Sequence, residues 1–195
     1  MSKKSINLTA ATDPEWAHYI VTNHLNAFIA DHANCERKAS SMAMSLIVKY
    51  PDRLDMIPPL IALAQEELLH FQQVYTIMEK RQIGLIKDTQ DPYVNGLLKL
   101  LRHGREPRFM DRLLLGSVIE CRGAERFKLI SHALEDTELK HFYRDLWASE
   151  AKHGHQFVEF ALLYFDPEDT YARLHTLMAQ EAEIIQALPW RASLH

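Results

Sequence analysis

Apolar residues recur at intervals of three and four along most of the chain, and the strict alternation typical of β-strands is absent. This periodicity predicts an all-α protein. We expect four long amphipathic helices, over about residues 14–49, 59–83, 107–134 and 137–165. A short helix is expected near residues 92–103, and a final helix over about 168–187.

Three Asp-Pro pairs predict where helices begin. An aspartate side chain accepts hydrogen bonds from the amides of a first helical turn, and proline at the first helical position sacrifices no bond. The pairs are Asp13-Pro14, Asp91-Pro92 and Asp166-Pro167. Tyr50-Pro51 and Gly84 predict the ends of the first two long helices.

The order of these helices indicates a fold class. The first and second long helices are joined by a short turn, as are the third and fourth, so that each pair can form an antiparallel hairpin. A connector of roughly twenty residues separates the pairs, which is typical of a ferritin-like four-helix bundle with one long crossover. We expect residues 1–195 to form a single domain of this class, with the last helix packed against the bundle.

Composition narrows the class of protein and its expected location in the cell. Hydrophobic residues make up 47% of the chain and charged residues 25%, as in an ordinary globular protein, and the net charge of −4 disfavours an indiscriminate nucleic-acid binder. No apolar run approaches the roughly 18 residues of a membrane span, and no apolar segment follows the N-terminus. We therefore expect a cytoplasmic protein without membrane contact, in which Cys35 and Cys121 stay reduced.

Two Glu-x-x-His motifs are the first sign of chemistry. They are Glu67-Leu68-Leu69-His70 and Glu150-Ala151-Lys152-His153. On a helix, residues three apart share one face, so that a carboxylate and an imidazole can approach the same metal ion. One such motif alone is weak support, because both residue types are common on solvated helices.

An internal repeat strengthens this interpretation. Glu36 lies 31 residues before Glu67, and Glu120 lies 30 residues before Glu150. The chain thus contains two copies of one unit, a helix with a glutamate followed by a helix with Glu-x-x-His. Each of the four glutamates continues the apolar line of its helix and is expected to point inward.

Four inward carboxylates require compensating charge, because burying an unpaired carboxylate costs several kcal/mol. Interhelical salt bridges would need four basic partners on the inward stripes, and the pattern shows none. Carboxylate and imidazole ligands favour iron or manganese. The predicted metal ligands are Glu36, Glu67, His70, Glu120, Glu150 and His153.

Some residues near the predicted ligands in sequence have more than one possible role. Glu125 competes with Glu120 for the ligand position on the third long helix, with Glu120 favoured by spacing and by the apolar stripe. Glu125 would then support the ligands, act as an additional ligand, or pair with Arg122 or Arg126. Glu66, His32 and His155 are expected to point elsewhere. His32 is either a packing histidine or a group that supports Glu36.

Several sequence segments around the predicted ligands are more specific to one protein family than the Glu-x-x-His motifs are. They are Asp31-His32-Ala33-Asn34-Cys35-Glu36-Arg37-Lys38-Ala39, Gln65-Glu66-Glu67-Leu68-Leu69-His70-Phe71, Ile119-Glu120-Cys121-Arg122 through Glu125-Arg126-Phe127, and Phe142-Tyr143-Arg144 through Ser149-Glu150-Ala151-Lys152-His153. Over about residues 25–165 the chain resembles the MiaE-type tRNA hydroxylases.

The resemblance implies two iron ions held by the six predicted ligands, O₂ as co-substrate and a separate two-electron donor protein. It implies hydroxylation of the isopentenyl group of 2-methylthio-N6-isopentenyladenosine at tRNA position 37. The alternatives are another ferritin-like oxidase, such as a quinone-type hydroxylase, or an iron-handling protein.

A basic strip in the connector is a candidate contact for the tRNA anticodon loop. Its phosphates could be held by the cations of the strip, with His103 or Phe109 available for base stacking. A solvated connector of mixed charge is the alternative. The basic residues are Lys99, Arg102, Arg105, Arg108 and Arg112.

Overall fold

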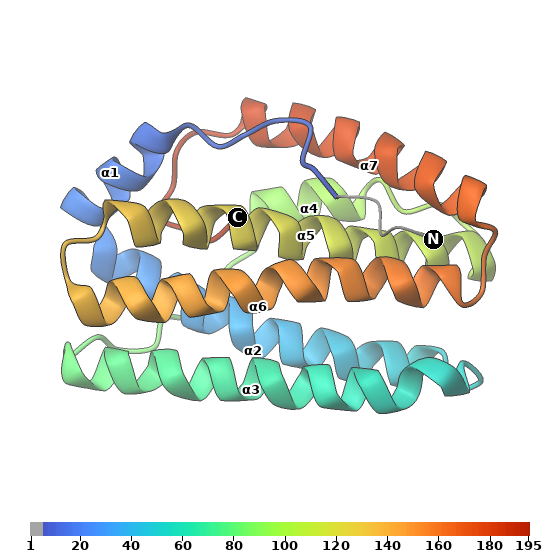
Figure 1. Cartoon of the computed structure of the whole chain (residues 1–195), viewed down its shortest axis with the longest axis horizontal. Coiled ribbons are helices and arrows are strands. Elements are labelled where there is room, and N and C mark those ends of the chain that lie inside the picture. The colour runs from blue at the N-terminus through green and yellow to red at the C-terminus, as the bar shows by residue number, and fades with distance from the viewer. Residues whose placement is uncertain (1–5) are drawn as a thin grey trace. The chain divides into compact units, whose positions relative to one another are not determined.

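A computed structural model describes residues 6–195 of the chain. Every regular element in this range is helical, as the periodicity predicted. None of the described helices combines the length and apolar composition that crossing a membrane requires. In chain order the elements are α1 (Pro14–Asn23), α2 (Leu25–Lys49), the 3-10 turn η1 (Leu54–Met56), α3 (Ile57–Lys80), α4 (Pro92–Leu98), α5 (Arg105–Ala133), α6 (Thr137–Leu162) and α7 (Pro167–Ala187) (Figure 1).

The helices belong to two compact units. The α2–α3 unit comprises Ile20–Thr89 and Arg191–Leu194, and the α5–α6 unit comprises the described residues up to Tyr19, Gln90–Trp190 and His195. Within each unit, two long helices connected by a short turn lie side by side and antiparallel (Figure 1). Both predicted hairpins are therefore present.

The three predicted Asp-Pro helix starts are confirmed. Asp13 Oδ1 accepts a hydrogen bond from the amide of Glu15 at 3.0 Å. The side chains of Asp91 and Asp166 do the same for the amides two residues later, at 2.9 Å and 2.8 Å. Each bond satisfies an amide that has no partner within its own helix.

Several predicted helix boundaries are wrong. The helix expected over 92–103 ends at Leu98, and the one expected over 137–165 ends at Leu162. The helix expected over 14–49 is interrupted at His24 (φ −139°, ψ 17°), after Thr22 and Asn23, whose helix propensities are low. The helix expected to end at Gly84 ends at Lys80. There Gln82 adopts the left-handed conformation (φ 57°), and the amide of Ile83 donates to the Met78 carbonyl at 2.8 Å.

The last helix packs within the α5–α6 unit, as predicted. Leu174, Leu177 and Met178 of α7 are buried, and Ile184 contacts Gly96 of α4. Between α5 and α6 the core is largely aromatic, because Phe127 packs on Tyr143 and Phe157 packs over Gly116.

A buried arginine ties the α5–α6 unit together. The side chain of Arg122 is fully buried on α5, and its Nε and Nη2 donate to the two carboxylate oxygens of Glu181 on α7 at 2.8 Å and 3.0 Å. Tyr93 of α4 donates to the same carboxylate at 3.0 Å. Burial lowers the pKa of Arg122, but Glu181 and Glu125 more than offset this and hold its pKa above the usual value.

Candidate metal centre

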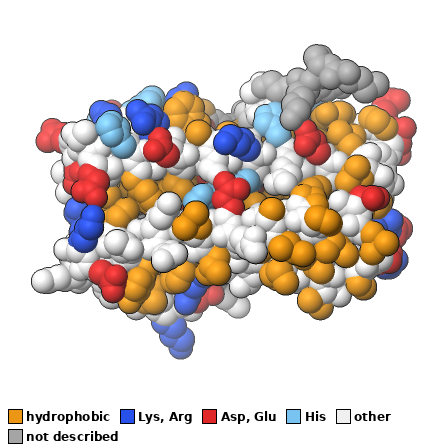
Figure 2. Space-filling model, turned by 60° about the horizontal axis from the view of Figure 1, so that its bottom comes forward, with side chains coloured by type: hydrophobic (Ala, Val, Ile, Leu, Met, Phe, Trp, Pro, Cys, Tyr) orange, Lys and Arg blue, Asp and Glu red, His pale blue; other side chains and the backbone are white. Residues whose placement is uncertain are grey.

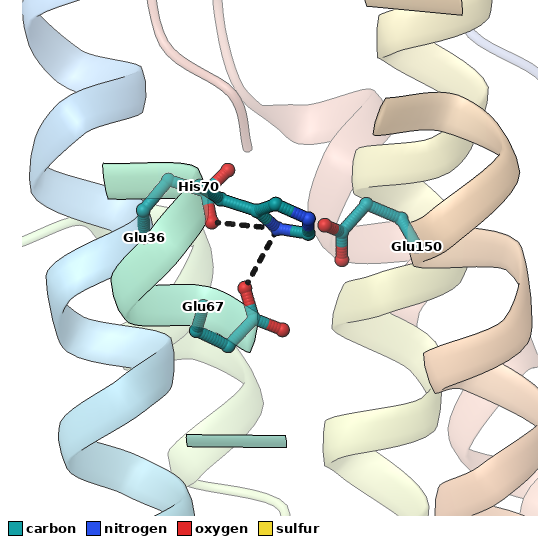
Figure 3. A group of neighbouring side chains, drawn as sticks. All are labelled: Glu36, Glu67, His70 and Glu150. Atoms are coloured by element: carbon teal, nitrogen blue, oxygen red, sulfur yellow. Dashed lines mark ion pairs between the residues drawn. The ribbon is translucent and has the colours of Figure 1, made fainter. Parts of the chain in front are cut away.

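Three predicted ligands meet inside the α2–α3 unit. Glu36 comes from α2, and Glu67 and His70 come from α3; all three are buried, with exposed fractions between 1% and 7%. One ligand atom from each lies within 4.8 Å of the others. Nδ1 of His70 is 3.6 Å from Glu36 Oε2 and 3.4 Å from Glu67 Oε2 (Figure 3). We call these residues the first half-site.

The local sequence explains this placement. Glu67 and His70 occupy the same stripe of α3 as the buried Leu63, Ala64 and Val74. Between the two helices, the Ser40 hydroxyl donates to the Ala64 carbonyl at 2.8 Å, which fixes their register close to the half-site. Because a three-residue step brings Glu67 and His70 to one face, the α3 stripe presents both towards α2.

His32 differs from its predicted orientation. It is fully buried one turn before Glu36, and its Nε2 lies 2.5 Å from Glu36 Oε1. Since a carboxylate only accepts, Nε2 carries the proton of this bond. His32 therefore supports Glu36, which was one of the two alternatives. Glu66, by contrast, is exposed as expected.

The α5–α6 unit contains the matching arrangement. Glu120 of α5 and Glu150 and His153 of α6 are buried, with exposed fractions between 3% and 7%, and each offers one ligand atom within 4.8 Å of the others. Nδ1 of His153 lies 3.3 Å from Glu150 Oε2. These residues form the second half-site.

Glu120, and not Glu125, lies in this half-site. Glu125 accepts hydrogen bonds from the amide of Thr12 at 3.0 Å and from the Thr12 hydroxyl at 2.7 Å. It also accepts from Arg122 Nη1. Five residues of helix turn Glu125 away from Glu120, and the alternative in which Glu125 pairs with Arg122 is the one observed.

Close packing of α5 on α6 accompanies the second half-site. A Cβ atom at Gly154, the residue after His153, would lie 2.7 Å from Sγ of Cys121, the residue after Glu120. The thiol is mostly buried, and burial raises the pKa of Cys121 to about 11, so it stays protonated at neutral pH. Neither cysteine forms a disulfide in the described structure. Sequence reasoning missed this contact.

The donor set of each half-site fits a divalent cation. At neutral pH an imidazole is ordinarily uncharged, so two carboxylates give each half-site a formal charge of −2. Burying that charge is costly unless a cation compensates it. Oxygen and imidazole ligands without thiolates suit iron or manganese.

The basic strip is only partly available to a ligand. Lys99, Arg102 and Arg105 are exposed, whereas Arg108 and Arg112 are half-buried. Phe109 is fully buried, so it cannot stack on a base. That part of the expectation is wrong, because Phe109 packs on Tyr164 and Phe165.

Arg102 is bound to a buried aspartate. It donates to Asp111 through Nη2 at 2.8 Å, and Arg173 of α7 donates to the same carboxylate at 2.9 Å. Burial raises the pKa of Asp111, but the two arginines lower it by a larger amount. The pKa of Asp111 therefore lies below its ordinary value of 3.8. Arg102 therefore anchors the start of α5.

Comparison with known proteins identifies the family. A family model described as tRNA-(MS[2]IO[6]A)-hydroxylase (MiaE) matches residues 1–195. The chain belongs to this family.

Two relatives are described as tRNA 2-(methylsulfanyl)-N(6)-isopentenyladenosine(37) hydroxylases. The one from Pseudomonas putida is 39% identical over 160 residues, which are 82% of this chain and 77% of the relative. That of Salmonella typhimurium is 35% identical over 130 residues, 67% of this chain and 47% of the relative.

A solved structure shows the fold. It is described as Protein 43 with aldehyde deformylating oxygenase activity from Synechococcus, and it matches with a TM-score of 0.91 and 30% identity over 97% of this chain and 96% of that chain. The predicted fold class is confirmed: this MiaE-family chain is all-α and ferritin-like, with one long crossover and an additional C-terminal helix.

Gly154→Ala tests the close packing beside the second half-site. We expect a loss of about 1–3 kcal/mol in unfolding free energy, because the added methyl group overlaps the Cys121 thiol. Combining it with Cys121→Ala should recover much of this loss. Gly84→Ala is the matched control, since nothing lies within 4 Å of its added methyl group. Denaturant unfolding of Gly154→Ala, Cys121→Ala, the double variant and Gly84→Ala measures the coupling between the first two changes. Additive effects of the two changes would contradict the contact.

Proposed function

We propose that the two half-sites together bind two iron ions, and that the chain uses them to hydroxylate the isopentenyl group of 2-methylthio-N6-isopentenyladenosine at tRNA position 37. One observation carries the proposal: each unit of this MiaE-family chain buries a glutamate beside a Glu-x-x-His pair. On this proposal residues 1–195 act as one ferritin-like domain.

The six side chains have distinct tasks in the proposed centre. Glutamates supply oxygen ligands and negative charge, and the two histidines supply neutral nitrogen ligands. The proposed ligands are Glu36, Glu67, His70, Glu120, Glu150 and His153. Four carboxylates formally balance two ferrous ions, which favours a pair of ions over a single one.

Bound iron would supply the redox chemistry with O₂. In the overall reaction one oxygen atom enters a C–H bond of the isopentenyl group and the other leaves as water, with two electrons and two protons taken up. The electrons require an external donor, which we propose to be a separate protein. His32 holds Glu36 through its hydrogen bond, and the buried position of the ligands limits access of bulk water.

The tRNA substrate is supported by the family and by the two relatives, which are described as hydroxylases of this nucleoside. We propose that the exposed cations at Lys99 and Arg105 contact tRNA phosphates near the anticodon loop. Because its proposed substrate is a tRNA, we also propose that the protein acts in the cytoplasm.

Removing a ligand tests the centre and the reaction together. Glu67→Ala or His153→Ala should lower the iron content far below two ions per chain and abolish formation of the hydroxylated nucleoside in cells. Glu66→Ala is the matched control, because Glu66 adjoins Glu67 in sequence and is exposed. Metal analysis of the purified protein and mass spectrometry of tRNA nucleosides provide the two measurements.

The two readouts separate the two parts of the proposal. Iron bound normally by Glu67→Ala would refute the ligand assignment. An unchanged nucleoside profile in cells lacking this protein, with iron present in the purified chain, would instead point to another ferritin-like oxidase. Accumulation of many iron ions in an assembled shell would indicate an iron-handling protein.

His32 is expected to act as a positioning residue for Glu36. His32→Ala should weaken iron binding about 10–100-fold, as is typical when a partner that orients a ligand is removed. His32→Gln retains an N–H donor and should recover part of the affinity. Iron titration of the apo-protein measures this. If both variants bind iron as tightly as the unsubstituted protein, His32 has a packing role only.

The Lys99→Ala, Arg105→Ala double variant should weaken tRNA binding and reduce the salt dependence, by roughly one unit of slope per lost phosphate contact, while iron content is unchanged. Lys128→Ala with Lys140→Ala removes the same charge from exposed sites elsewhere in the α5–α6 unit and serves as control. Filter binding at several salt concentrations measures both. Equal slopes for the two double variants would show that the strip does not bind tRNA.

A further inference from the structure

Several large apolar side chains of the α2–α3 unit are exposed. Figure 2, in which the lower part of the view in Figure 1 comes forward, shows hydrophobic side chains gathered on one face. In this unit the exposed fractions run from 38% to 76% for Met44, Val48, Leu54, Ile61, Leu68, Leu69 and Tyr75. Single exposed apolar residues are ordinary, but a contiguous group marks a contact surface.

The spacing along α3 is that of a helix-packing seam. Steps of four, three, four, three and four residues link a line of exposed positions, which is the pattern with which one helix packs along another. The line alternates apolar and polar side chains: Ile61, Gln65, Leu68, Gln72, Tyr75 and Glu79.

The charge on this face disfavours lipid and RNA as partners. From Ile57 to Met78, α3 contains no lysine or arginine, and its only charged side chains are Glu66 and the buried Glu67. Helices that lie on anionic membranes, or that follow a phosphate backbone, present basic residues beside the apolar ones. A protein helix fits this face better.

The two ends of α3 carry opposite charges. Asp52 and Asp55 precede the helix with Arg53 between them, 3.7 Å from Asp52, whereas Glu79, Lys80 and Arg81 end it. The formal charge is therefore −1 before the helix and +1 at its end. Two antiparallel copies of α3 would bring acidic ends against basic ends, and two parallel copies would bring like charges together. The charge pattern therefore complements itself in one orientation only.

We propose that this face binds a second copy of the chain, with the two α3 helices antiparallel about a two-fold axis at Leu68. In this register Leu68 meets its own copy and Ile61 is level with Tyr75, while Gln65 and Gln72 of the two copies lie within one residue of being level. Apolar positions thus meet apolar ones, and amides meet amides that can hydrogen-bond across the axis. Asp55 lies opposite Lys80 and Arg81 at each end.

Leu68→Glu tests the interface at its centre, because it sets two carboxylates against each other on the axis. In sedimentation velocity, the full-length protein should form dimers as its concentration rises. Leu68→Glu should raise the dimer dissociation constant more than about 30-fold, as expected for a central contact. Leu163→Glu is the control: Leu163 is 54% exposed and Leu68 is 57% exposed, but Leu163 lies at the end of α6.

A charge exchange tests the orientation. Asp55→Lys alone and Lys80→Asp alone should each weaken the dimer, and the double variant should restore it. A protein that stays monomeric at all concentrations would overturn the proposal, as would a Leu68→Glu variant that dimerises normally. Binding to phosphatidylcholine vesicles that Leu68→Glu abolishes would overturn it in favour of a membrane surface. None of these outcomes depends on iron or on tRNA.

Discussion

Burial of carboxylates within helical hairpins is the constraint on which the rest of this protein depends. Glu36 and Glu67 are enclosed in one unit, and Glu120 and Glu150 in the other. Burying a charge without compensation would cost several kcal/mol, comparable with the total stability of a small domain. The helices must therefore bring each carboxylate close to an imidazole and to a place where a cation can bind. The fixed register at Ser40 and the close approach at Gly154 serve this requirement.

The same chain handles buried charge in a second way. Arg122 and Glu181 are both fully buried, yet they neutralise each other through two hydrogen bonds, and Tyr93 adds a third donor. Such a network is complete without any ion and holds α4, α5 and α7 together. The half-sites contain carboxylates and histidines but no arginine. This contrast separates a structural ionic cluster from one whose composition requires a metal ion.

Local patterns predicted the elements, whereas contacts between distant residues decided the details. The Asp-Pro starts and the inward glutamates follow from capping and helical periodicity, which need only neighbouring residues. The left-handed conformation of Gln82 and the helix break at His24 are also local features. Several backbone conformations are compatible with the sequence at these two places, so the sequence alone did not predict them. Burial of Phe109 and the bond from Arg122 to Glu181 depend on which helices meet in space. Spacing left Glu120 and Glu125 as competitors. Glu125 is engaged by Arg122, a partner that the sequence offered, and by Thr12, which is 113 residues away in sequence and could not be foreseen.

The internal repeat is not symmetric in its chemistry. His32 stands four residues before Glu36 and donates to it, whereas the equivalent position before Glu120 is Gly116, against which the ring of Phe157 packs. The first half-site thus has a polar support for its first glutamate, whereas one turn before Glu120 the helix carries no side chain and an aromatic ring packs there instead. Because outer hydrogen bonds and apolar walls tune bound metals in different ways, the two ions of the proposed centre would have unequal surroundings. A sequence repeat can therefore supply matching ligands without supplying matching sites.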